Sequence, residues 1–125
     1  MEKTIEQIAR SDGRYDAKAL HFVYEGLGQT IQNIRENVDT QEDRHISGQE
    51  LADGLGDLAK RRWGKLAKLV LNQWGINNTR DFGEIVYLMI DNKWMRSQET
   101  DRIEDFDNVF DFENRFVANF RFDMN

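Results

Sequence analysis

The sequence contains no cysteine and no proline. Without cysteine the chain has no disulfide, no thiolate metal ligand and no cysteine nucleophile. Without proline, glycine and clusters of polar residues are the main indications of turns. No apolar stretch approaches the roughly 18 residues of a membrane span, and the first ten residues carry charges where a signal peptide has an apolar core. We therefore expect a cytoplasmic protein with no membrane partner.

The residues that common enzymes use are also scarce. The chain has only two histidines and three serines, and no serine lies in a G-x-S-x-G motif. No G-x-x-x-x-G-K-[ST] phosphate loop occurs either. The sequence therefore predicts no catalytic residue, no metal site and no cofactor. This favours a non-catalytic protein over an enzyme of unrecognised type.

The amino-acid composition as a whole is typical of one folded domain. Hydrophobic residues make up 39% and charged residues 32% of 125 residues, enough apolar content to bury a core. The net charge is −6, and residues 99–125 contain eight acidic residues and only three arginines. Most of the acidic excess therefore lies at the C-terminal end, and the rest of the chain is close to neutral. We predict a single domain over residues 1–125.

Two helices are predicted in the first part of the chain, residues 1–45. Thr4 and Gln7 have the spacing of a capping box, so a short helix begins there and ends near Gly13. Asp16 is the predicted N-cap of a long helix over residues 17–36. Its buried stripe recurs at steps of three and four and contains Leu20, Val23, Leu27, Ile31 and Ile34. The polar residues up to 45 are predicted to form a loop.

Residues 46–94 are predicted to form a three-helix core. Ser47 and Glu50 form a second capping box, and Gly64 divides the first of these helices from the next. Thr79 is the predicted N-cap of the last, which ends near residue 94. The apolar residues of the three helices are Leu51, Leu55, Leu58 and Ala59, then Leu66, Leu69, Val70 and Trp74, then Phe82, Ile85, Val86, Met89 and Ile90.

Residues 95–125 form an acidic, phenylalanine-rich end that fits two patterns. Phe112, Phe116 and Phe120 have helical spacing, whereas Phe120 and Phe122 alternate as in a strand. We predict a short β-hairpin followed by one or two helical turns, with these phenylalanines buried. The fold class is then mainly α: a helical domain resembling a winged helix-turn-helix, with an N-terminal helical extension and a short C-terminal β-hairpin.

Two motifs are typical of binding sites but lack their context. The segment GLGDLA, residues 54–59, matches a dinucleotide-binding pattern, yet that pattern must follow a strand and open a helix. Here it lies inside a predicted helix, where the glycines are better explained by close helix packing. His21 and Glu25 share a helix face, as two metal ligands can. A metal ion needs further ligands, and His45 is the only other histidine in the chain.

The C-terminal aspartates resemble a calcium site only in composition. A calcium-binding EF-hand loop requires glycine at position 6 and glutamate at position 12, and no starting residue in this segment satisfies both. We interpret these residues as a solvated acidic hairpin. They are Asp101, Asp105, Asp107 and Asp111.

A basic segment is the best candidate for an interaction surface. Five cations and a tryptophan lie close together, and this combination suits nucleic acids. However, the predicted last helix carries Asp81, Glu84 and Asp91, which repel phosphates. We therefore predict a protein partner or self-association, with nucleic-acid binding as the alternative. The candidate surface contains Lys60, Arg61, Arg62, Trp63, Lys65 and Lys68, together with Phe116 and Phe120.

Several segments resemble a known family. They are FVYEGL at residues 22–27, HISGQEL at 45–51, LVLNQWGI at 69–76 and DFGEIV at 81–86. Over about residues 15–112 the chain resembles an uncharacterised family of conserved hypothetical bacterial proteins found mainly in Planctomycetes and Verrucomicrobia. The resemblance implies a single cytosolic bacterial domain. It implies no activity, substrate or site residue.

Overall fold

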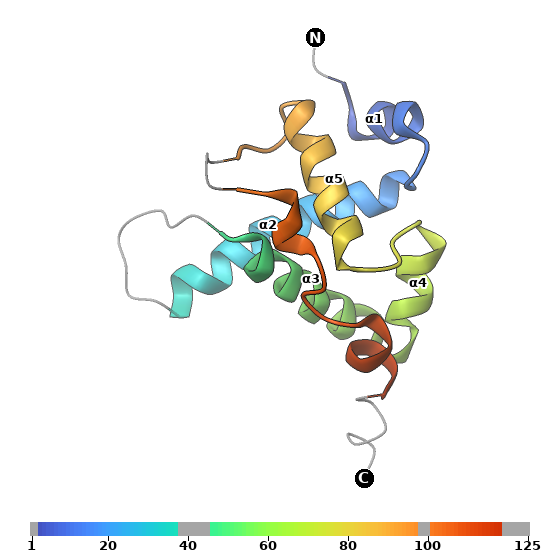
Figure 1. Ribbon diagram of the computed structural model, residues 1–125, viewed down its shortest axis with the longest axis vertical. Helices are drawn as coiled ribbons and strands as arrows, with labels where there is room; N and C mark the ends of the chain where they lie inside the picture. Colours follow the sequence, from blue (N-terminus) through green and yellow to red (C-terminus); the bar gives the residue numbers. More distant parts are fainter. Residues whose placement is uncertain (1–2, 38–45, 98–100, 119–125) are drawn as a thin grey trace.

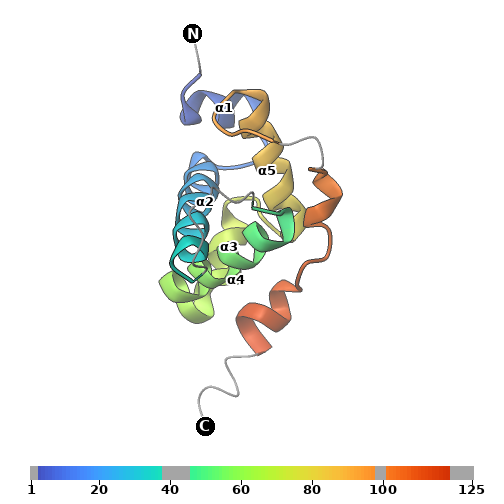
Figure 2. The same cartoon turned by 90° about the vertical axis from the view of Figure 1, so that its left-hand side faces the viewer.

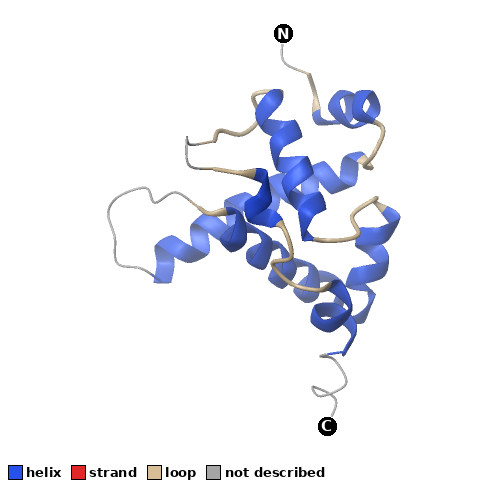
Figure 3. Cartoon of the chain, viewed as in Figure 1, coloured by secondary structure: helices blue, strands red, loops and turns tan. Residues whose placement is uncertain are grey.

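The computed structural model describes residues 3–37, 46–97 and 101–118, and these form helices joined by loops, with no strand (Figures 1 and 3). The prediction of a mainly helical chain is confirmed. The α-helices are α1 (Ile5–Asp12), α2 (Ala17–Asn37), α3 (Gly48–Trp63), α4 (Ala67–Gln73) and α5 (Thr79–Asp91). Two short 3-10 helices, η1 (Gly64–Leu66) and η2 (Ile103–Phe106), and a π-helix, η3 (Glu113–Ala118), complete the described part.

Local capping signals explain where two of the helices begin. The Thr4 hydroxyl accepts a hydrogen bond from the Gln7 amide at 3.1 Å, and the Gln7 side chain accepts one from the Thr4 amide. Ser47 and Glu50 make the same reciprocal pair at the start of α3. These bonds satisfy amides that have no partner within the helix. Both predicted capping boxes are confirmed.

The predicted cap of the last helix is wrong by one residue. Asn78, not Thr79, is the N-cap of α5, and its side chain accepts a hydrogen bond from the Asp81 amide at 3.0 Å. Thr79 is the first helical residue and is buried. Asparagine and threonine are both common caps, so local propensity does not separate the two positions.

The core lies between α2, α3 and α5. Seen from the side, α2 runs along one edge of the molecule and the C-terminal segment lies at the opposite edge (Figure 2). Although α2 has 21 residues, no helix in the described ranges is both long and apolar enough to cross a membrane. Fully buried side chains at the centre include Leu20, Val23, Leu55, Ile85 and Met89.

At three glycines the backbone of a helix lies directly against a neighbouring side chain. Gly54 and Gly56 of α3 have no room for a Cβ atom, because Thr30 lies against the first and Phe110 against the second. Gly83 of α5 lies equally close to the Phe106 ring. The predicted helix packing is therefore confirmed for Gly54, which meets α2, whereas Gly56 packs against the irregular segment before η3.

The predicted C-terminal β-hairpin is wrong, and with it the wing of a winged helix-turn-helix. The described residues from 101 to 118 form η2, an irregular segment and η3. Thr79 connects this segment to α5, since its hydroxyl donates to the Phe106 carbonyl at 2.6 Å and accepts from the Val109 amide at 3.1 Å. These bonds to α5 satisfy backbone groups that a hairpin would have paired across strands.

Candidate functional site

The cations of the basic segment lie on the end of α3, on η1 and on α4. Arg62 pairs with Glu25 of α2, and the Lys68 amine lies 3.8 Å from a carboxylate oxygen of Glu113 in η3. Arg61 donates a long hydrogen bond of 3.4 Å to the Gln29 side chain. The acidic C-terminal segment therefore meets the basic segment within one chain.

Trp63 is half-buried and packs one part of its ring against the core. Its ring centroid lies 5.3 Å from that of Phe22 and 5.2 Å from that of Trp74, and the second pair is edge-to-face. Such contacts are typical of aromatic residues in a core. Trp63 therefore joins α3 to α2 and to the end of α4.

The two phenylalanines of the candidate surface have different outcomes. Phe116 is fully buried and meets Phe110 and Phe112 edge-to-face, at centroid distances of 5.7 and 5.2 Å. It therefore belongs to the core, as its predicted burial requires, and is not available to a partner. Phe120 lies outside the described residues.

Two apolar residues that were predicted as part of the three-helix core, Leu66 and Leu69, instead lie exposed next to the cations. Leu66 is 60% exposed and Leu69 is 55% exposed. They are three positions apart across the junction of η1 and α4, so their side chains are neighbours. Lys65 and Lys68 flank them. We call Lys65, Leu66, Lys68 and Leu69 the apolar-basic surface.

The candidate metal ligands on α2 do not meet. The His21 ring nitrogen Nε2 lies 2.7 Å from a carboxylate oxygen of Glu6 on α1, while Glu25 pairs with Arg62. The hydrogen bond from His21 lowers the pKa of the Glu6 carboxyl. His45 lies outside the described residues. Within the described ranges, no three histidines or acidic residues gather closely enough to hold a metal ion.

The C-terminal aspartates make separate structural contacts. Asp107 accepts hydrogen bonds from Arg80 at 2.9 and 3.2 Å. Asp111 accepts one from the backbone amide three residues further along, at 2.9 Å. Asp105 accepts a bond of 3.3 Å from the Arg102 amide at the start of η2. The Asp107 contact joins the chain after η2 to α5, whereas the other two are local bonds at the starts of η2 and η3.

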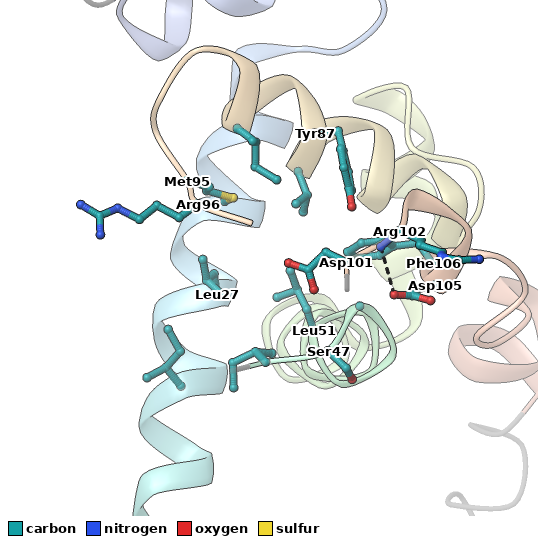
Figure 4. A pocket seen from close by; sticks show the side chains of 15 residues that line it. Leu27, Ser47, Leu51, Tyr87, Met95, Arg96, Asp101, Arg102, Asp105 and Phe106 are labelled. Carbon is teal, nitrogen blue, oxygen red and sulfur yellow. Dashed lines mark hydrogen bonds between the residues drawn. The ribbon is translucent and has the colours of Figure 1, made fainter. Parts of the chain in front are cut away.

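A cavity of about 260 Å³ lies between α2, the start of α3, α5 and η2. Figure 4 shows its lining, with the Tyr87 hydroxyl and the Asp101 carboxylate both directed into the space. The apolar part of the wall contains Leu27, Leu51, Val86, Ile90, Met95 and Phe106. No pattern in the sequence indicated this cavity, because its wall combines four segments that are distant along the chain.

Comparison with known proteins identifies no relative: no family model, no curated protein and no solved structure matches this chain. The resemblance to the bacterial family therefore stays a prediction.

Proposed function

We propose that the protein is a non-catalytic interaction module that docks a partner protein on the apolar-basic surface. The observation that carries this proposal is the exposure of Leu66 and Leu69, at 60% and 55%, beside lysines. Adjacent exposed apolar side chains with a polar rim are typical of protein interaction sites.

The chemistry of this surface favours an acidic partner segment with apolar side chains. Lys65 and Lys68 place positive charge beside the leucines, and the exposed 3.8 Å contact of Lys68 with Glu113 offsets only part of it, so a negatively charged helix or loop is complementary. A second copy of the chain fits less well. A symmetric dimer would set this basic surface against an identical basic surface, and Phe112 and Phe116 are already buried.

Peptide titration tests the proposal. We expect a synthetic amphipathic helix with leucines on one face and glutamates on the other to shift the amide resonances of η1 and α4. The double variant Leu66→Gln/Leu69→Gln should weaken binding at least about tenfold, because exposed side chains are replaced and the fold is retained. A peptide with lysine in place of every glutamate is the matched control.

Three results would overturn the proposal. The acidic peptide fails to bind, the two peptides bind equally, or the double variant binds like the parent. Light scattering adds a further outcome. A dimer that forms at high concentration and is lost in the double variant would assign the surface to a second copy instead.

Nucleic-acid binding through residues 60–68 is the alternative, supported by the density of cations. Packing of Trp63 against Phe22 and pairing of Arg62 with Glu25 weaken it. We expect no complex with duplex or single-stranded probes in low-salt mobility-shift assays. A complex that dissociates steeply with salt, and that is abolished by lysine-to-glutamate changes at 60, 65 and 68, would favour this alternative.

A further inference from the structure

The cavity between α2, α3, α5 and η2 has the size and wall of a site for a small apolar molecule. Its volume of about 260 Å³ lies just below the roughly 300 to 1,000 Å³ of pockets for drug-sized ligands. At roughly 30 Å³ for a water-sized group, it holds about eight or nine non-hydrogen atoms. Leu27 and Leu51 line one part of the wall and Ile90 and Met95 another, so the body of the ligand is apolar.

Charged residues also line the cavity, and their signs balance. Two are acidic and two are basic: Asp101, Asp105, Arg96 and Arg102. The Asp105 carboxylate already accepts a hydrogen bond of 3.3 Å from the Arg102 amide. An ion of either sign would lose its water and meet groups of its own sign as well as groups of the opposite sign. The wall therefore favours an uncharged ligand, and this conclusion does not require any of the four groups to be unpaired.

Tyr87 provides a hydrogen-bond donor without a partner. Its hydroxyl oxygen is buried and makes no hydrogen bond to any of the described residues, and Figure 4 shows this hydroxyl pointing into the cavity. Burial, followed by the charges of Asp101 and Asp105, raises the pKa of Tyr87, so the hydroxyl keeps its proton and can donate it. Leaving a buried hydroxyl unpaired costs free energy, which a bound oxygen acceptor would recover.

We propose that this cavity binds a small uncharged molecule with an apolar body and one oxygen acceptor, as in a ketone or an alcohol. The apolar body lies between α2 and α5, against Leu27, Leu51 and Ile90, and its oxygen accepts a hydrogen bond from the Tyr87 hydroxyl. This site uses none of the residues of the apolar-basic surface, so it does not rest on the proposed docking function.

Four probes of nearly equal size and shape test the ligand class. Acetophenone is neutral and has an acceptor oxygen, 2-phenylpropene carries a methylene group in place of that oxygen, and benzoate and benzamidinium carry opposite charges. We would titrate the full chain with each probe and follow the amide resonances of the cavity wall. We expect acetophenone to bind saturably, about threefold to tenfold tighter than 2-phenylpropene because of one hydrogen bond. It should bind at least about tenfold tighter than either ion, because an ion loses more hydration.

The variant Tyr87→Phe tests the hydroxyl, because it keeps the ring and removes only the donor. It should lower the affinity for acetophenone to that for 2-phenylpropene and leave the affinity for 2-phenylpropene unchanged. Without a probe, this variant should melt at or above the temperature of the parent, since the hydroxyl that it lacks has no partner to lose. Tyr24→Phe, on α2 and outside the cavity wall, is the matched control and should retain the preference of the parent.

The proposal is overturned if acetophenone gives no saturable shifts in the cavity wall. It is also overturned if benzoate or benzamidinium binds as tightly as acetophenone, since the site would then not select an uncharged molecule. A parent that does not distinguish acetophenone from 2-phenylpropene, or a Tyr87→Phe variant that still does, would show that the hydroxyl does not bind the ligand. A Tyr87→Phe variant that melts well below the parent would show that the hydroxyl already has a partner.

Discussion

Thr79 connects two parts of the fold through a single hydroxyl group. It donates to the Phe106 carbonyl and accepts from the Val109 amide, and the side chain is 1% exposed. Replacing it with valine keeps the shape and removes both bonds, leaving two backbone groups without these partners. We expect Thr79→Val to lower the free energy of unfolding by roughly 1 to 3 kcal/mol in urea denaturation.

Thr79→Ser provides the control, because serine retains the hydroxyl and loses only a methyl group. It should stay closer to the parent than the valine variant. If the valine variant is at least as stable as the serine variant, the two hydrogen bonds contribute no net stability and the burial of the side chain alone explains its role.

At the scale of elements, the segment after η2 contributes aromatic side chains to the core. Phe112 and Phe116 are 4% and 0% exposed, and the Phe112 ring also contacts Phe82 of α5 at 5.9 Å between centroids. Burial of each is worth about 1.5 to 3 kcal/mol, against a total stability of roughly 5 to 15 kcal/mol for a typical domain. Cutting the chain after Asp107 should therefore abolish cooperative melting followed by circular dichroism, or cause aggregation.

A second truncation, after Ala118, tests Phe112 and Phe116 separately from Phe120, because it removes only the last of the three phenylalanines. It retains η3, so we expect it to melt cooperatively and close to the parent. A chain cut after Asp107 that stays monomeric and melts like the parent would show that the phenylalanines are not needed for the core and serve another purpose.

At the scale of the whole molecule, a network of charges joins three distant segments. Arg14, before α2, contacts Glu84 of α5 at 3.1 Å, and Arg80 contacts both Glu84 at 3.0 Å and Asp107 after η2 at 2.9 Å. Hydrogen bonds from Arg80 and Arg14 lower the pKa of the Glu84 carboxyl below its ordinary value of 4.5. The folded state therefore binds this proton less tightly than the unfolded state does.

A carboxyl whose pKa is lowered by folding stabilises the folded state above its ordinary pKa, and this contribution is lost as the pH falls through the folded value. We expect Glu84→Gln to be less stable than the parent by about 0.5 to 1 kcal/mol at pH 7, a small value because the contacts are partly exposed. The difference should shrink as the pH falls below 4.5.

Urea denaturation between pH 7 and 3 measures this difference. Glu104→Gln is the control, since Glu104 is exposed and has no ion pair with any described residue. A difference between Glu84→Gln and the parent that is the same at both ends of the pH range would contradict the linkage to Glu84.

The candidate sites were only partly predictable. The cations at residues 60–68 stand out in the sequence, but the packing of Trp63 against Phe22 and Trp74 and the exposure of Leu66 and Leu69 do not. A stripe of apolar residues predicts a helix face without identifying the partner that covers it. The cavity was missed because Tyr87 and Asp101 have no local pattern that sets them apart.

The sequence by itself determined where several helices begin and end. The capping boxes at Thr4 and Ser47 and the helix end at Gly64 depend on bonds or dihedral angles within a few residues. The local sequence therefore predicts them. Only the tertiary structure decided that the C-terminal segment packs as 3-10 and π-helical turns. The deciding bonds, such as that of Thr79 to Phe106, join residues 27 positions apart, and no local propensity encodes such contacts.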